Sequence, residues 1–246
     1  MNYISSIGKY VEMIRRVFSR PERFKVYYVR TIDELVVIGL NSMAIVFILS
    51  VFMGAVISLQ VASNMDSPLL PKYTIGYITR STTILEFSPT IISLILAGKV
   101  GSNIASEIGT MRVTEQIDAL EIMGVNSASF LILPKVVAAM MFFPFLIIFS
   151  MVLALLGGYF SITMTGLASL EEYVYGIRAF FKVSDVTYAL QKTVVFAFII
   201  TSVSAYFGYN TRGGALEVGK SSTQAVVWSS VIILIANLIL TQLILI

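Results

Sequence analysis

Five long apolar runs alternate with polar connections along the chain. The runs cover residues 36–59, 81–99, 130–159, 188–206 and 226–246. Because about 20 apolar residues are enough for a helix to cross the hydrocarbon core of a bilayer, each run predicts a transmembrane helix. The third run is longer than one bilayer needs, so its helix is expected to tilt, kink or project. The pattern therefore predicts an all-α integral membrane protein with five transmembrane helices.

The N-terminal segment shows a different pattern. Its apolar residues recur at alternating steps of three and four, at Ile4, Ile7, Val11, Ile14 and Phe18. With basic residues between them and Pro21 after them, this spacing predicts an interfacial amphipathic helix on the cytoplasmic leaflet. A helix packed against the protein's own bundle fits the same pattern. We divide the chain into this N-terminal interfacial region, residues 1–35, and a five-span domain, residues 36–246.

Residues 107–124 form a short, polar helical pattern between the second and third runs. Thr114 is placed to act as N-cap, and Gly124 is placed to end the helix with a positive φ. At 100° per residue, one narrow stripe carries Val113, Ile117, Leu120 and Gly124. The opposite side carries Arg112, Glu115, Asp118 and Glu121. One side is able to bury while the other meets a partner, which predicts a short docking helix.

Composition and charge limit the classes of function that this chain can have. Of 246 residues, 57% are hydrophobic and 13% are charged, with no cysteine and no histidine, and the mean hydropathy is +0.88. Disulfides, thiolate catalysis, imidazole acid–base chemistry and most zinc sites are thereby excluded. Seven of the seventeen Lys and Arg residues precede the first apolar run. This clustering indicates membrane orientation rather than nucleic-acid binding, and it places the N-terminus in the cytoplasm.

The orientation of the N-terminus determines on which side of the membrane each connection between the spans lies. With the N-terminus in the cytoplasm, five spans put the C-terminus outside and place the connections 101–129 and 210–224 on the cytoplasmic side. Two ridges of small residues predict close packing between the spans. The first ridge is Ser50, Gly54 and Ser58, and the second is Ala97, Gly101, Ala105 and Gly109.

The second run carries an ionisable residue and a proline. Glu86 at membrane depth predicts a cavity or a partner, although snorkelling to the outer interface fits it equally well. Pro89 frees a backbone carbonyl near Leu85 that another group must satisfy. Before this run, residues 61–80 indicate an external connection, with polar and proline positions at Asn64, Asp66, Pro68 and Pro71. Residues 166–185 indicate an amphipathic external segment.

Residues 214–221 read GALEVGKS, which satisfies the phosphate-loop pattern G-x-x-x-x-G-K-[ST]. A phosphate loop needs a strand before it, a helix after it and an acidic residue that helps to hold magnesium. Here one apolar run precedes the motif and another follows it. We therefore interpret it as a glycine-rich cytoplasmic turn and expect this chain to bind no nucleotide.

Three strings in the middle of the chain carry a family resemblance. They are AGKVG at residues 97–101, EIGTMRVTEQ at 107–116 and ALEIMGV at 119–125. With five spans and an N-terminal interfacial helix, the chain resembles the MlaE (YrbE) family of permease subunits of ABC transporters that move lipids with MCE proteins. Ser127 departs from the family pattern, where proline is usual, and Phe87 and Ser88 replace a usual Leu-Gly pair.

The resemblance implies a set of partners. The chain would be a homodimeric, non-enzymatic phospholipid permease in the bacterial inner membrane that binds no cofactor itself. ATP and magnesium would sit on a separate cytoplasmic ATPase (MlaF-like). An MCE protein (MlaD-like) would lie on the periplasmic side, and a small STAS-type protein (MlaB-like) is a further expected partner. No nucleic acid is expected.

The resemblance also implies two sets of site residues. The family's polar cavity residue maps onto Glu86 through the Glu-x-x-Pro string, and we assign Gln60 and Tyr77 to the same candidate substrate cavity. The candidate ATPase-coupling residues lie in the polar helical pattern and are Glu107, Arg112, Glu115, Gln116, Asp118, Leu120 and Glu121. The alternative function from another class is an ion- or proton-coupled secondary transporter or channel that uses Glu86.

Overall fold

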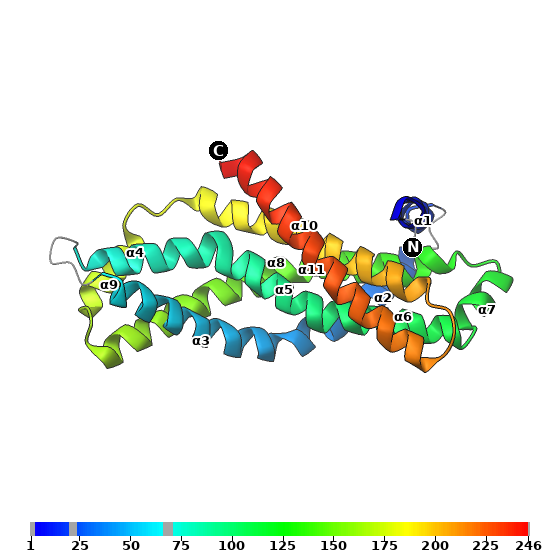
Figure 1. Ribbon diagram of the computed structural model, residues 1–246, viewed down its shortest axis with the longest axis horizontal. Helices are drawn as coiled ribbons and strands as arrows, with labels where there is room; N and C mark the ends of the chain where they lie inside the picture. The colour runs from blue at the N-terminus through cyan, green and yellow to red at the C-terminus, as the bar shows by residue number, and fades with distance from the viewer. Residues whose placement is uncertain (1–2, 20–23, 66–70, 246) are drawn as a thin grey trace. The chain divides into compact units, whose positions relative to one another are not determined.

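The structure is a computed structural model that describes residues 3–19, 24–65 and 71–245. Within these ranges the regular elements are all helices (Figure 1). The all-α fold class is confirmed. Some positions on which the sequence predictions rest lie outside the described residues. They are Arg20 and Arg23, which belong to the N-terminal basic cluster, and Pro21, Asp66 and Pro68.

Five helical stretches are long and apolar enough to cross a membrane, as the sequence predicts. They run over Lys25–Ser63, Tyr73–Val113, Ser127–Thr165, Val183–Tyr209 and Ala215–Leu243. Each is longer than its apolar run, because the flanking polar residues continue the helix rather than end it. A helix of 39 residues such as Ser127–Thr165 is about 58 Å long, so the third span exceeds a bilayer's hydrocarbon core, as expected.

The first two spans are not uniform α-helices. The first comprises α2 (Phe24–Glu34), the π-helical segment η1 (Leu35–Leu40) and α3 (Asn41–Ser63). The second comprises α4 (Tyr73–Thr82), η2 (Thr83–Ile91), α5 (Ile92–Leu96), η3 (Ala97–Gly101) and α6 (Ser102–Val113). The remaining elements are α1 (Tyr3–Val17), α7 (Gln116–Ile122), α8 (Ser127–Thr165), α9 (Leu170–Arg178), α10 (Val183–Tyr209) and α11 (Ala215–Leu245). π-Helical turns often mark functional sites, which directs attention to η2.

The chain forms two compact units. Unit 1 takes its described residues from Met1–Ser42, Leu94–Phe143 and Val194–Ile246, and unit 2 is formed by Met43–Ser93 and Pro144–Thr193.

In unit 1 the N-terminal helix lies crosswise to two spans. Helix α1 is seen nearly end-on in Figure 1, whereas α10 and α11 run across the view. One face of α1 packs on α10, where the Tyr10 and Ser202 hydroxyls lie 2.8 Å apart and Val17 is buried. The apolar side chains of Ile7, Val11 and Phe18 stay exposed. The predicted amphipathic helix therefore has both an apolar free face and a face that packs on the bundle.

The second small-residue ridge packs in unit 1 as predicted. A Cβ added to Gly101 would lie 2.8 Å from the Ser204 hydroxyl of α10, and one added to Gly109 would lie 3.3 Å from the Val218 side chain of α11. Ala105 is fully buried between them. Because these side chains are small, α6 approaches both helices closely.

In unit 2 the first ridge packs against α8. A Cβ on Gly54 would overlap the backbone of Ala154, and one on Gly157 would overlap the backbone of Val51. Ser50 donates a hydrogen bond to Ser150 at 2.9 Å. Gly157 and Gly158 therefore lie inside α8, where their lack of a side chain lets α3 approach closely.

The predicted external connection 61–80 is wrong in its second half. Helix α4 begins at Tyr73, and Figure 1 shows it beside α9. The fully buried Arg80 side chain donates to the Ile177 carbonyl at 3.0 Å and to the Ala179 carbonyl at 2.7 Å. Those carbonyls belong to the C-terminal end of α9 and the residue after it. The sequence pattern suggests a loop residue at position 80, but the fold buries this cation and supplies carbonyl oxygens as its hydrogen-bond acceptors.

Most of the phosphate-loop pattern also lies in a helix. The residues from Ala215 onward form the first two turns of α11, and only Gly214 precedes them. Glu217 and Lys220 form an exposed ion pair at 2.6 Å one turn apart. The glycine-rich turn expected over 214–221 is thus too long, because Ala, Leu, Glu and Lys favour a helix that the two glycines do not prevent.

Candidate coupling helix and membrane ion pairs

Helix α7 starts with a sharp change of direction. Thr114 ends α6 instead of capping α7, because its hydroxyl donates back to the Thr110 carbonyl at 2.9 Å. Glu115 then adopts the left-handed conformation, with φ of 59° and ψ of 12°. The predicted N-cap role of Thr114 is therefore wrong. A left-handed residue that is not glycine is unfavourable by about 1 kcal/mol or more, so the surrounding contacts must hold this bend.

Three contacts hold α7 in place within unit 1. Ile117 is fully buried, and Arg112 of α6 donates to Asp118 at 2.6 Å. Gly124 ends the helix with φ of +79°, as predicted, and the next amide, that of Val125, donates to the Leu120 carbonyl at 3.1 Å. The Arg112–Asp118 ion pair thus joins the short helix to the end of the second span, while the backbone hydrogen bond closes the C-terminal end of α7 itself.

The carboxylate of Glu121 adds a fourth attachment. It accepts hydrogen bonds from the Ser127 hydroxyl and the Tyr209 hydroxyl, both at 2.9 Å. The Ser127 hydrogen bond, helped by that of Tyr209 and by the nearby Arg112 charge, lowers the pKa of Glu121. Ser127 stands where the family resemblance leads one to expect proline, and here its hydroxyl links α7, α8 and the end of α10.

The lowered pKa gives a pH prediction. A carboxyl whose folded-state pKa is depressed stabilises the protein above its unfolded pKa, about 4.3, and loses that contribution as pH falls through the folded-state pKa. We expect Glu121→Gln to reduce the difference in melting temperature between about pH 7 and about pH 3. The matched exchange Glu115→Gln, at an exposed carboxyl, should leave that difference unchanged. An equal effect of the two exchanges would contradict the role of Glu121.

The outward side of α7 is apolar at its C-terminal end. Ile122 is 87% exposed and Met123 is 68% exposed, while Glu115 and Gln116 are exposed at the other end. Gln116 donates to the Thr114 hydroxyl at 3.0 Å, and Leu120 is half-buried. Two large apolar side chains held on a fixed helix are a feature of docking surfaces.

The structure therefore separates the predicted coupling residues into those that pair within the chain and those that face outward. Arg112, Asp118 and Glu121 gather around Tyr209, whose ring lies 5.8 Å from the Arg112 guanidinium carbon. Arg112 pairs with Asp118, and Glu121 accepts hydrogen bonds from within the chain, although Asp118 and Glu121 stay partly exposed. Glu115 remains on the outer surface.

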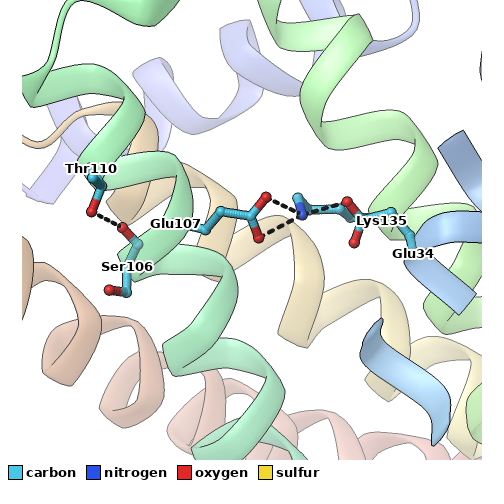
Figure 2. Close-up of polar contacts among 5 residues, drawn as sticks. All are labelled: Glu34, Ser106, Glu107, Thr110 and Lys135. Atoms are coloured by element: carbon cyan, nitrogen blue, oxygen red, sulfur yellow. Dashed lines mark hydrogen bonds and ion pairs between the residues drawn. The ribbon is translucent and has the colours of Figure 1, made fainter. Parts of the chain in front are cut away.

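Glu107, whose side chain is 42% exposed, joins an ion-pair cluster around a buried lysine (Figure 2). Lys135 of α8, only 4% exposed, lies 2.6 Å from a Glu34 oxygen of α2 and 2.8 Å from a Glu107 oxygen of α6. A buried cation of this kind needs such partners, because removing a lysine from water is costly. Glu107 is thus part of a link among three helices of unit 1.

A second buried lysine pairs with the candidate cavity carboxylate in unit 2. Lys192 of α10, 0% exposed, lies 2.9 Å from Glu86 and donates to the Leu85 carbonyl at 3.3 Å. Pro89 lacks the amide that a carbonyl in this turn would meet, so the prediction that another group must satisfy a carbonyl near Leu85 is confirmed. Glu86 also accepts from Thr90 at 3.2 Å, and 45% of its side chain remains exposed.

The other two candidate cavity residues lie elsewhere in unit 2. Tyr77 packs edge-on against Phe180, with ring centroids 6.2 Å apart, and its ring lies 5.0 Å from the Arg80 guanidinium carbon. Gln60 is exposed near the end of α3. Glu86 and Tyr77 therefore contact different residues.

Sequence reasoning missed the cations of these sites. Arg80, Lys135 and Lys192 are buried, yet the sequence pattern led to no role for any of them. The available signal was a basic residue close to or inside an apolar run, which is costly unless a partner neutralises it. The partners are distant in sequence, so only the fold identifies them.

The fold and its sites define a multi-pass helical membrane protein with buried lysines that pair with carboxylates of its spanning helices. The profile of the family described as "Permease MlaE" matches residues 31–243. The chain belongs to the MlaE permease family, and the resemblance stated from the sequence is confirmed.

Named relatives agree with this assignment. A "Probable ABC transporter permease protein" of Rickettsia bellii is 36% identical over 242 residues, covering 97% of this chain and 92% of the relative. The "Probable ABC transporter permease protein slr1045" of Synechocystis is 34% identical over 215 residues, covering 87% and 81%. "Protein TRIGALACTOSYLDIACYLGLYCEROL 1, chloroplastic" of Arabidopsis thaliana is 33% identical over 237 residues, covering 92% and 65%. The chain is therefore a transporter permease subunit.

Proposed function

We propose that this chain moves phospholipid between the inner membrane and a periplasmic MCE partner, driven by a separate cytoplasmic ATPase that binds ATP and magnesium. The observation that carries the proposal is the way in which α7 is exposed on one side and attached on the other. The helix exposes Ile122 and Met123 outward, and the ion pair of Asp118 with Arg112 attaches it to the end of the second span. Glu121 attaches it further to Ser127 of α8 and Tyr209 of α10. A helix gripped by a partner on one side and attached to a span on the other is able to transmit a movement.

Lipid as substrate is supported by two observations. The name of the Arabidopsis relative contains that of a galactolipid. In this chain the partly exposed Glu86, held by Lys192, puts a polar group beside apolar side chains at membrane depth, an arrangement suited to a lipid headgroup and its acyl chains. Gln60 and Tyr77 remain proposed members of the same cavity.

The remaining parts of the proposal concern assembly and orientation. The permease acts as a homodimer, with a STAS-type accessory protein as a further partner. Its N-terminus is cytoplasmic and its C-terminus periplasmic. The basic residues before the first span support this orientation. The contact between α7 and Tyr209 supports the expectation that the connections 101–129 and 210–224 share one side.

An ion- or proton-coupled transporter is the alternative based on Glu86. The ion pair with Lys192 supplies another reason for a carboxylate in the second span. Membership of a family whose relatives are named ABC transporter permeases favours coupling to ATP instead. No observation favours the alternative further.

Co-purification tests the proposal. The tagged chain, solubilised gently from its own membrane, should bring down an ABC ATPase and an MCE protein. A photocrosslinker at position 86 should then capture phospholipid in the assembled complex more strongly than one at the exposed Leu238 of α11. Isolation without either protein, or equal lipid capture at both positions, would overturn the proposed transport.

A further inference from the structure

An apolar groove in unit 1 has no role in the proposed transport. It has a volume of about 470 Å³ and lies among α1, α10 and α11. Its walls include Ile7, Tyr10, Val203, Tyr206, Trp228 and Ile235. The position is unusual because one wall is the crosswise N-terminal helix and the other two are spans. The groove therefore opens beside α1 and continues along the spans.

The length of the groove restricts its occupant. Along α11 it extends from Gln224 to Ile235, which corresponds to about 16 Å on an α-helix. The hydrocarbon core of a bilayer is about 30 Å thick, so one leaflet contributes about half of that. The groove thus matches the depth of one leaflet. A partner's transmembrane helix would need a groove about twice as long.

The polar side of α1 indicates the charge of the occupant. Lys9, Arg15 and Arg16 are exposed there, against one carboxylate, Glu12, which pairs with Arg16 at 2.7 Å. Basic residues on an interfacial helix attract anionic lipids. Lys9 is adjacent in sequence to the groove residue Tyr10.

We infer that the groove binds one acyl chain of an anionic phospholipid from the leaflet on which α1 lies, with the lipid phosphate at the level of α1 and its basic residues. The site is separate from Glu86 and requires neither ATP nor a partner protein. It needs only that α1 lie at the bilayer surface.

The chain's single tryptophan reports on this site directly. Trp228 lines the groove, and bromine atoms on a lipid acyl chain quench tryptophan fluorescence only at close range. The full chain is reconstituted in phosphatidylcholine vesicles containing acyl-brominated phosphatidylglycerol, or acyl-brominated phosphatidylcholine at the same fraction. We expect saturable quenching at lower fractions of the anionic lipid. Lys9→Gln should reduce the preference by up to about fivefold, whereas Lys182→Gln, at an exposed lysine of unit 2, should not.

A second experiment fills the groove with a larger side chain. Val231 lines it and is partly exposed, so Val231→Phe should fold and should weaken the anionic quenching several-fold. Leu234→Phe, at an exposed α11 position outside the groove wall, is the matched control. Equal quenching by the two lipids that Val231→Phe leaves unchanged would mean ordinary surrounding lipid and would overturn the inference. Protection of Trp228 from both lipids when the chain is isolated with its partners would assign the groove to a protein segment, and would overturn it too.

Discussion

Replacing Lys192 by methionine should cost about 3 kcal/mol of folding free energy, because it removes the cation from a buried ion pair. Lys192 is fully buried, and its loss leaves both the Glu86 carboxylate and the Leu85 carbonyl without this donor. Breaking a buried pair typically costs about 3–5 kcal/mol. We expect the lower part of this range, since 45% of the Glu86 side chain is exposed. The measurement is the thermal or denaturant midpoint of the purified protein.

Two further variants make this result interpretable. Lys182→Met removes an exposed lysine of the same unit and should leave the midpoint nearly unchanged. The double variant Glu86→Gln, Lys192→Met removes both charges, so most of the stability should return. If the double variant folds normally and still fails to transport lipid, the pair serves transport as well as folding. A midpoint for Lys192→Met equal to that of the parent protein would contradict the expected cost.

The second large effect is expected at α7. The double exchange Ile122→Glu, Met123→Glu should weaken binding of the ATPase by at least about 30-fold, because apolar anchors at the centre of an interface are each worth about 2 kcal/mol. Stability should change little, since these side chains are 87% and 68% exposed in the chain alone. Titration of the purified ATPase onto the permease in nanodiscs measures the loss.

The control uses the same chemistry at another place. Met164, also 87% exposed, lies at the far end of α8, and Met164→Glu should leave ATPase affinity unchanged. Asp118→Lys is informative in a different way, because it breaks the internal pair with Arg112 and should lower stability as well as affinity. Normal ATPase binding by the Ile122, Met123 double variant would exclude α7 as the docking contact.

The spans were predictable because their signal is local. About twenty consecutive apolar residues define a helix whatever it packs against. The end of α7 was predictable for the same reason, since Gly124 alone supplies the positive φ. Its start was not, because Thr114 is a good N-cap by composition. Only the fold shows that its hydroxyl donates to Thr110 and that Glu115 makes the bend.

The ionic sites were less predictable because they depend on contacts between distant residues. Glu86 was identified as an unusual carboxylate, but its partner Lys192 comes from α10. Glu107 was assigned to the coupling surface, whereas Lys135 draws it toward α8. The burial of Arg80 depends on carbonyls at the end of α9. The cost of burying a charge predicts that a partner exists, yet it does not say which one.

The π-helical segment η3 sets the register of everything that follows it in the second span. A π-turn holds one residue more than an α-turn. This extra residue therefore helps to determine which face α6 turns toward its neighbours. Gly98 lies within η3 with open space where a side chain would be. If the same residues were wound as an uninterrupted α-helix, α6 would be rotated by about 100° about its axis. Glu107 would then lose Lys135, and Gly109 would leave the surface of α11. The contacts of the helix that leads to α7 therefore depend on the number of residues before it as much as on their identity.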